Sequence, residues 1–327
     1  MNLKEKLEAK KDQETIAELR RQLADSNKQQ SMLIGQVDKA RRAKFTKIVP
    51  AKVRARLDGD KVRVICCDLH GSKMDRKAVA AFLADVRRLQ PDEIFLLGDM
   101  IDCGGFLAAH HTWGYLPETT YTYDDDILAG NTFLDQLREA APNALIEYLE
   151  GNHEQRISKW AISTAMRGGN PKDAEGLLRR NAPQYLLRLE DRGIKFYEMG
   201  EHYDGLAVPG FIKRGKCYFT HGSFVTAKHA TATIQAKIAG NVVFGNSHRE
   251  QAERVNRLSV GVVGAWNPGC LCLQQPLWQN TNPTDWSHGY AIQFVARSQN
   301  FLHVNIPLIG ESLLAPFLES TNEVTAR

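Results

Sequence analysis

Three features are absent from this sequence, and each absence narrows the class of protein. No apolar run approaches the ~18 residues of a membrane-spanning helix. The N-terminus begins with charged residues (Lys4, Glu5, Lys6) rather than with an apolar signal segment. The six cysteines include no CxxC pair of the kind that binds structural zinc. We therefore expect a cytoplasmic protein with reduced, mostly buried thiols and no membrane partner.

Acidic residues are missing from one segment, Lys39 to Arg56, which contains eight basic residues. Residues 1–60 hold 15 Lys and Arg against 9 Asp and Glu, whereas the remainder holds 27 against 29. An attraction to polyanions would therefore come from the N-terminal part. Nucleic-acid binding by residues 39–56 and a solvated linker are both open, because Phe45 is the one aromatic residue there that could stack on a base.

The first 44 residues lack proline, contain one glycine and are rich in helix-forming residues, so we expect a helix. An interrupted heptad seam follows from five apolar residues at a and d positions: Ile16, Leu19, Leu23, Leu33 and Val37. Ser26 and Gln30 occupy the intervening positions. This pattern predicts either a weak homodimer through a short coiled coil or a mostly solvated helix.

Beyond this extension, short apolar runs alternate with helical patterns, which is typical of an α/β fold with parallel strands. The strands are expected near residues 62–67, 93–97, 145–149, 194–197, 217–220 and 242–244. After residue 250 the pattern alternates without helices, through 255–263, 291–295 and 302–304. We expect these last segments to form a second, antiparallel-rich sheet.

Metal-binding residue types follow five of the predicted strands: Asp68 and His70, Asp99 and Asp102, Asn152 and His153, His221, and Asn246 and His248. Ligands of α/β folds lie at the carboxyl ends of the strands, so these side chains are expected to converge. Carboxylate and imidazole groups together suit manganese, iron or zinc. A single such residue is usually a solvated or capping residue, but five at one topological position indicate a metal site.

The motifs Asp68-Leu69-His70, Gly98-Asp99-Met100-Ile101-Asp102, Gly151-Asn152-His153-Glu154, Thr220-His221-Gly222 and Gly245-Asn246-Ser247-His248 resemble, in order and spacing, those of the calcineurin-like metallophosphoesterases. The resemblance covers residues 62 to about 306. It implies a four-layer αββα sandwich, and the helix predicted above from composition would be an N-terminal extension of it. The expected boundaries are 1–56 for the helix and basic linker, 57–308 for the metallophosphoesterase domain and 309–327 for a C-terminal tail.

The resemblance also implies two divalent metal ions about 3.5–4 Å apart, with manganese expected and iron or zinc as alternatives. The first would be held by Asp68, His70, Asp99 and His248, and the second by Asp99, Asn152, His221 and Asn246. Family members usually carry histidine at the position of Asn246, so we expect the second ion to bind more loosely.

The resemblance implies that a metal-bridging hydroxide attacks the phosphorus, with His153 as general acid or electrostatic stabiliser and Asp102 holding its imidazole. Cys103 stands where phosphoprotein phosphatases carry a phosphate-binding arginine. Arg156 or Arg249 would replace that arginine in substrate binding, unless each only forms a surface salt bridge.

The sequence therefore predicts a metal-dependent phosphoester hydrolase, leaning toward a phosphodiesterase or nuclease. Two alternatives are open. One is a phosphomonoesterase that acts on a small molecule or a phosphoprotein. The other is a non-catalytic module that binds nucleic acid and self-associates.

Overall fold

The computed structural model describes residues 18, 20–22, 48–50, 60–104, 122–236, 240–276, 282–309, 311–312 and 314. The chain divides into two units, Met1–Thr46 and Lys47–Arg327. In the first unit, residues 18 and 20–22 are helical, and the Gln22 amide donates to Glu18 at 3.2 Å. The heptad positions and the basic residues of 39–56 lie outside the described residues.

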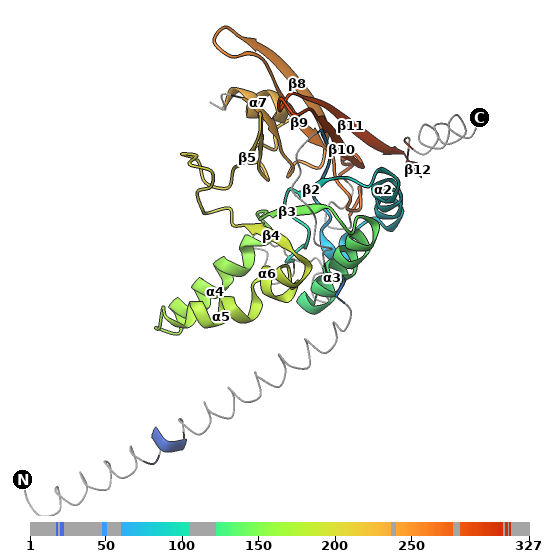
Figure 1. The fold of residues 1–327 in the computed structure, drawn as a ribbon. Coiled ribbons are helices and arrows are strands. Elements are labelled where there is room, and N and C mark those ends of the chain that lie inside the picture. The colour runs from blue at the N-terminus through green and yellow to red at the C-terminus, as the bar shows by residue number, and fades with distance from the viewer. Residues whose placement is uncertain are drawn as a thin grey trace, which may run out of the picture. The chain divides into compact units, whose positions relative to one another are not determined.

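The second unit contains helices and strands in mixed order (Figure 1). The helices are η1 (Gly71–Lys73), α2 (Arg76–Leu89), α3 (Tyr123–Ala140), α4 (Gln155–Arg167), α5 (Asp173–Asn181), α6 (Pro183–Leu186), η4 (Glu190–Arg192) and α7 (His229–Gln235). The strands are β1 (Lys61–Cys66), β2 (Glu93–Leu96), β3 (Leu145–Leu149), β4 (Ile194–Tyr197), β5 (Ile212–Arg214), β6 (Cys217–Phe219), β7 (Asn241–Val243), β8 (Glu250–Arg257), β9 (Gly261–Pro268), β10 (Gly289–Val295), β11 (Phe301–Ile309) and β12 (Glu311–Ser312).

Two sheets form the centre of this unit. The first has the strand order β12-β11-β10-β1-β2-β3-β4 and the second the order β5-β6-β7-β9-β8. Strands β1 to β4 are mutually parallel, as are β6, β7 and β9. The sheets face each other through the rings of Phe95 and Phe219, which stack with their centroids 4.1 Å apart. The guanidinium of Arg63 lies over both rings and forms an ion pair with Glu93.

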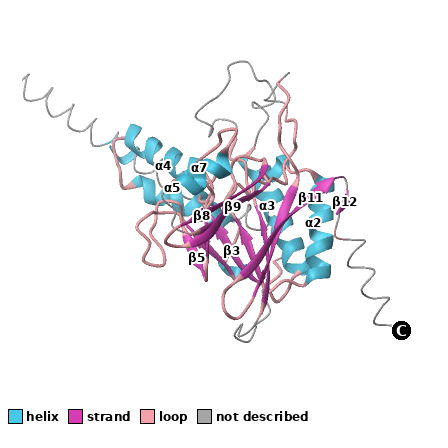
Figure 2. Ribbon diagram, turned by 90° about the horizontal axis from the view of Figure 1, so that it is seen from above, coloured by secondary structure: helices cyan, strands magenta, loops and turns pink. Residues whose placement is uncertain are grey.

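Helices cover the outer faces of both sheets, which gives four layers. The apolar face of α2 is buried, and Phe82 contacts Tyr290 of β10 and Phe133 of α3. Helix α7 packs on the second sheet, where Ala230 and Ile234 join a buried apolar cluster. In Figures 1 and 2, α2 and α3 lie on one side of the sheets and α4 and α5 on the other. The predicted αββα sandwich is thus confirmed.

The prediction for the C-terminal strands was partly wrong. Residues 255–263 do not form one strand, because a turn at 258–260 separates β8 from β9. Strand β10 does not extend the second sheet but pairs antiparallel with β1 of the first, and β11 pairs antiparallel with β10. Of the two neighbours of β1, β10 thus comes from a distant part of the chain, whereas β2 is the next strand in sequence. No helix in the described part of the chain is both long and apolar enough to cross a membrane.

Candidate metal centre

The candidate site is built from the loops that follow β1, β2, β3, β6 and β7. Backbone hydrogen bonds hold these loops together. The amides of Asp68 and His70 donate to the carbonyls of Gly98 and Asp99 at 3.1 and 2.9 Å, and that of Gly245 donates to His221 at 2.8 Å. The carboxyl ends of parallel strands therefore meet at one edge of the sandwich, as such folds place their ligands.

One group of predicted ligands, which we call the first cluster, comprises Asp68, His70, Asp99 and His248. Their ligand atoms lie within 4.8 Å of one another, and all four residues are buried. Nε2 of His248 lies 3.2 Å from Oδ1 of Asp68 and 3.1 Å from Nε2 of His70. Nε2 of His70 lies 3.9 Å from Oδ2 of Asp99. This donor set can hold a divalent cation.

A second cluster adjoins the first and shares Asp99. Nε2 of His221 lies 2.9 Å from Oδ1 of Asn152 and 3.3 Å from Oδ2 of Asp99. The other ring nitrogen of His221 contacts the Leu97 carbonyl at 2.7 Å, so Nε2 is the atom directed at the cluster. Asn246 behaves differently, because its Nδ2 donates to the carbonyl of Gly222 at 3.1 Å.

The carboxylates of both clusters fit a bound cation. Oδ1 of Asp68 and Oδ2 of Asp99 are buried and accept no hydrogen bond. Burial raises the pKa of Asp68, but His248 outweighs it and holds the pKa below its ordinary value. Burial likewise opposes ionisation of Asp99, yet His153 and His221 hold its pKa well below the ordinary value. A buried carboxylate oxygen with no donor costs free energy, and a cation at this position would remove that cost.

The backbone at the site adopts an unusual conformation. Asp68, His70, Asp99, Asn246 and His248 all have positive φ, between 53° and 70°. The left-handed region costs a non-glycine residue roughly 1–2 kcal/mol. Such outliers persist where the surrounding structure enforces them, and they gather at functional sites.

His153 and Asp102 lie beside the first cluster. Nδ1 of His153 lies 2.5 Å from the Asp102 carbonyl and 3.2 Å from Oδ1 of Asp102. The same Oδ1 lies 3.0 Å from Nδ1 of His70, so one carboxylate orients two imidazoles. Although burial lowers the pKa of His153, Asp99 and Asp102 raise it above its ordinary value.

Arg156 contacts His153 directly. Its Nη2 lies 2.9 Å from Nε2 of His153, and its Nη1 donates to the carbonyls of Asp102 and Cys103 at 3.0 and 3.1 Å. A guanidinium only donates, so the neutral form of His153 accepts this contact at Nε2 and carries its proton on Nδ1. Arg156, predicted to bind substrate, is thus buried with its donors directed at the site's own residues.

Arg249, the other predicted substrate-binding residue, has different neighbours. Its guanidinium pairs with Asp285 at 3.0 Å and donates to the carbonyls of Val225 and Thr226 at 2.6 and 3.0 Å. None of these partners belongs to either cluster.

Two buried acidic residues, for which no function was predicted individually, bind the backbone of the site loops. Glu154 accepts the backbone amides of Asp99, Met100, Ile101 and Gly151 and the Tyr148 hydroxyl. Asp126, in the first turn of α3, accepts the amides of Ser72, Asp102 and Cys103. Glu154 could have been identified from its place in the motif Gly151-Asn152-His153-Glu154. Asp126 could have been identified as one of three consecutive acids at the start of α3.

Gly151 is required at its position for steric reasons. A Cβ atom there would lie 2.1 Å from Oδ1 of Asp99 and 2.7 Å from Oε2 of Glu154. Any side chain would therefore displace the carboxylate that both clusters share.

No protein-family model and no curated protein matches the chain. Solved structures do. A phosphoesterase from E. coli, Yfce, is 16% identical over 75% of this chain and 98% of its own, with a TM-score of 0.32. A Streptococcus pneumoniae protein described as a predicted phosphoesterase is 12% identical over 77% and 99%, with a TM-score of 0.27. Vps29 from Entamoeba histolytica is 13% identical over 77% and 94%, with a TM-score of 0.33. At these values the similarities assign neither family nor activity to this chain.

Proposed function

We propose that the chain is a calcineurin-like, dinuclear-metal-dependent phosphoester hydrolase that prefers phosphodiesters. The observation that carries this proposal is the pair of buried carboxylate oxygens, on Asp68 and Asp99, that accept no hydrogen bond at the centre of converging imidazoles. Asp68, His70, Asp99 and His248 would hold one cation. Asp99, Asn152 and His221 would hold the other, with Asn246 as its weakest contributor.

Manganese suits the first cluster, and iron or zinc would also bind its imidazole and carboxylate groups. When bound, the cations would make hydroxide available near neutral pH and neutralise charge on the phosphoryl oxygens. The protein's own groups then act on the substrate. Asp102 fixes the ring of His153 beside the shared carboxylate of Asp99, where His153 stabilises or protonates the leaving oxygen.

The preference for diesters follows from the cationic side chains. A phosphomonoester is a dianion near neutral pH and needs more positive charge than a monoanionic diester. Arg156 donates to His153 and to two carbonyls, and Arg249 bonds to Asp285 and to two other carbonyls. In both guanidiniums the terminal nitrogens already contact groups of the protein rather than facing a second phosphate charge.

The decisive assay compares bis(p-nitrophenyl) phosphate with p-nitrophenyl phosphate. Metal-stripped protein should hydrolyse neither ester, and added Mn²⁺ should restore hydrolysis, faster for the diester. Asp99→Asn serves as the blank for contaminating phosphatases. Faster monoester cleavage would favour the phosphomonoesterase alternative. If Mn²⁺ binds and neither ester is cleaved, the protein is a binding module.

The second part of the proposal concerns residues 1–56. Nucleic acid would be the polyanionic substrate that this segment binds, and the N-terminal helix would form a weak dimer. The support is the sequence alone, with eight basic residues and no acid from Lys39 to Arg56. Deletion of residues 1–56 should leave diester hydrolysis almost unchanged but weaken binding to DNA. That binding should fall with salt at a log-log slope of about −0.9 per phosphate neutralised. An unchanged slope after deletion would make the segment a linker.

A further inference from the structure

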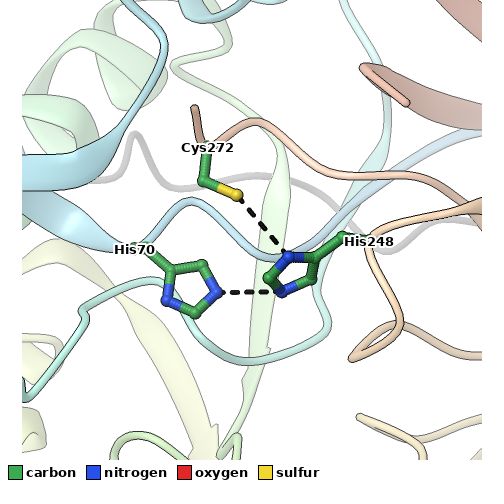
Figure 3. Close-up of side chains that lie close together, drawn as sticks. All are labelled: His70, His248 and Cys272. Carbon is green, nitrogen blue, oxygen red and sulfur yellow. Dashed lines mark hydrogen bonds between the residues drawn. The ribbon is translucent and has the colours of Figure 1, made fainter. Parts of the chain in front are cut away.

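The imidazole of His248 is contacted from three directions. Its Nε2 faces Asp68 Oδ1 and His70 Nε2 inside the first cluster, at 3.2 and 3.1 Å. Its Nδ1 faces Sγ of Cys272 at 3.8 Å, and Figure 3 shows this contact beside the one between His248 and His70. The ring of Trp286 packs edge-on against it, with centroids 4.0 Å apart. Cys272 is thus the neighbour of Nδ1, the ring nitrogen that does not face Asp68 and His70, and its sulfur lies within 4.8 Å of ligand atoms of both His70 and His248.

The backbone holds Cys272 firmly in this place. Cys272 forms an isolated β-bridge with Met74, and its backbone carbonyl lies 2.8 Å from Nε2 of His288. The side chain is 1% exposed, so water does not compete for Nδ1 from this direction. The sulfur is therefore held beside the imidazole by a segment that is itself in contact with Met74 and His288.

A neutral imidazole that binds a cation through Nε2 must carry its hydrogen on Nδ1. Histidine ligands almost always donate that hydrogen to a neighbouring acceptor, usually a carboxylate, a carbonyl or water, and this contact fixes the tautomer and the ring orientation. In His70 the acceptor is Asp102, and in His221 it is the Leu97 carbonyl. His248 has a thiol sulfur at the equivalent place.

We propose that Cys272 is a positioning residue of the first cation site, whose sulfur accepts the Nδ1 hydrogen of His248 and directs the Nε2 lone pair at the cation. This inference rests on the proposed metal centre. Sulfur is a weak acceptor, so His248 is held in orientation without the gain in basicity that a carboxylate would give. His70 and His248 are then unequal ligands of one cation, the first supported by a carboxylate and the second by a thiol.

The test measures cation affinity and imidazole tautomer, not activity. Cys272→Val removes the sulfur acceptor and adds one carbon, as the matched control also does, so it should weaken Zn²⁺ binding at the first site by about 10- to 100-fold in a chelator competition. The matched control is Cys217→Val, since Cys217 is equally buried but its sulfur contacts Gln293. The control should bind Zn²⁺ like the wild type. In the Zn²⁺-loaded wild type, ¹⁵N NMR should show His248 protonated at Nδ1 and ligated through Nε2.

Three results would overturn the inference. The first is equal Zn²⁺ affinity of Cys272→Val and the wild type. The second is ligation through Nδ1 of His248 in the NMR spectrum, which needs no variant and so holds even if Cys272→Val fails to fold. The third is a thiolate-to-metal charge-transfer band in the Co²⁺-loaded wild type that Cys272→Ser abolishes, since Cys272 would then be a ligand. If the wild type binds no cation, the proposed function fails as well, whereas the three results above leave it intact.

Discussion

Oδ2 of Asp99 lies 3.3 Å from Nε2 of His221, and no hydrogen bond reaches that oxygen although both residues are buried. The same oxygen lies 3.9 Å from Nε2 of His70, which belongs to the other cluster. A single carboxylate therefore faces both groups of imidazoles. In the proposed centre, Asp99 is the residue that both cations share.

Asp99→Asn should abolish activity, because the amide removes the negative charge common to both cation sites. A cation contributes several kcal/mol of transition-state stabilisation, so kcat for the diester should fall by about 10³-fold or more. Metal content measured by elemental analysis should fall with it. A variant that retained its full metal content and wild-type turnover would show that Asp99 is not shared.

His153→Ala should reduce turnover without loss of metal, since His153 contacts Asp102 and Arg156 and is not a proposed ligand. The expected loss in kcat is about 10²- to 10⁴-fold, the usual value of one general acid. Elemental analysis of the purified variant checks the second half of the prediction. Loss of a cation from His153→Ala would mean that His153 is itself a ligand.

The second cation should be lost first on dialysis, and Asn246→His should retain it. The Asn246 amide donates to Gly222, and its oxygen is a poorer ligand for transition metals than imidazole is. Histidine already occupies the same left-handed conformation at His70 and His248, so the substitution adds no new strain. Titration calorimetry with Mn²⁺ decides the matter: two equally tight sites in the wild type would contradict the argument.

Glu154→Gln should destabilise the protein and weaken both cation sites. The carboxylate accepts five donors, and a glutamine would present an NH₂ group to some of them, at a cost of about 1–3 kcal/mol in the free energy of unfolding. Tyr148→Phe is the matched control, because it removes one donor and leaves the backbone amides bonded. Denaturant unfolding of the metal-free proteins compares the two. If Glu154→Gln is no less stable than Tyr148→Phe, Glu154 does not hold the Asp99 loop.

Much of the fold was predictable because each strand around the site is a short apolar run that ends abruptly in polar residues. Four buried residues from Glu93 to Leu96, followed by Gly98 and Asp99, illustrate this pattern. The position of β10 and β11 was not predictable, because an alternating pattern specifies a strand but not its partner. Only the fold shows that β10 lies beside β1 and β11 beside β10.

Less of the site than of the fold was predictable from the sequence. Residue types at the strand ends indicated which side chains converge, but not which hydrogen bonds they make. No function was predicted for Asp126 or Glu154 individually, yet their carboxylates bind the backbone of the site loops. Arg156 was predicted to bind substrate, yet its guanidinium donates to His153 and to two backbone carbonyls. Such partners depend on distances between distant segments, which a linear pattern does not contain.

The most direct test of the metal centre is anomalous diffraction from a crystal soaked in Mn²⁺. The account predicts one strong peak among Asp68, His70, Asp99 and His248, and a second, weaker peak among Asp99, Asn152 and His221. Peaks elsewhere, or an empty site at saturating Mn²⁺, would contradict it.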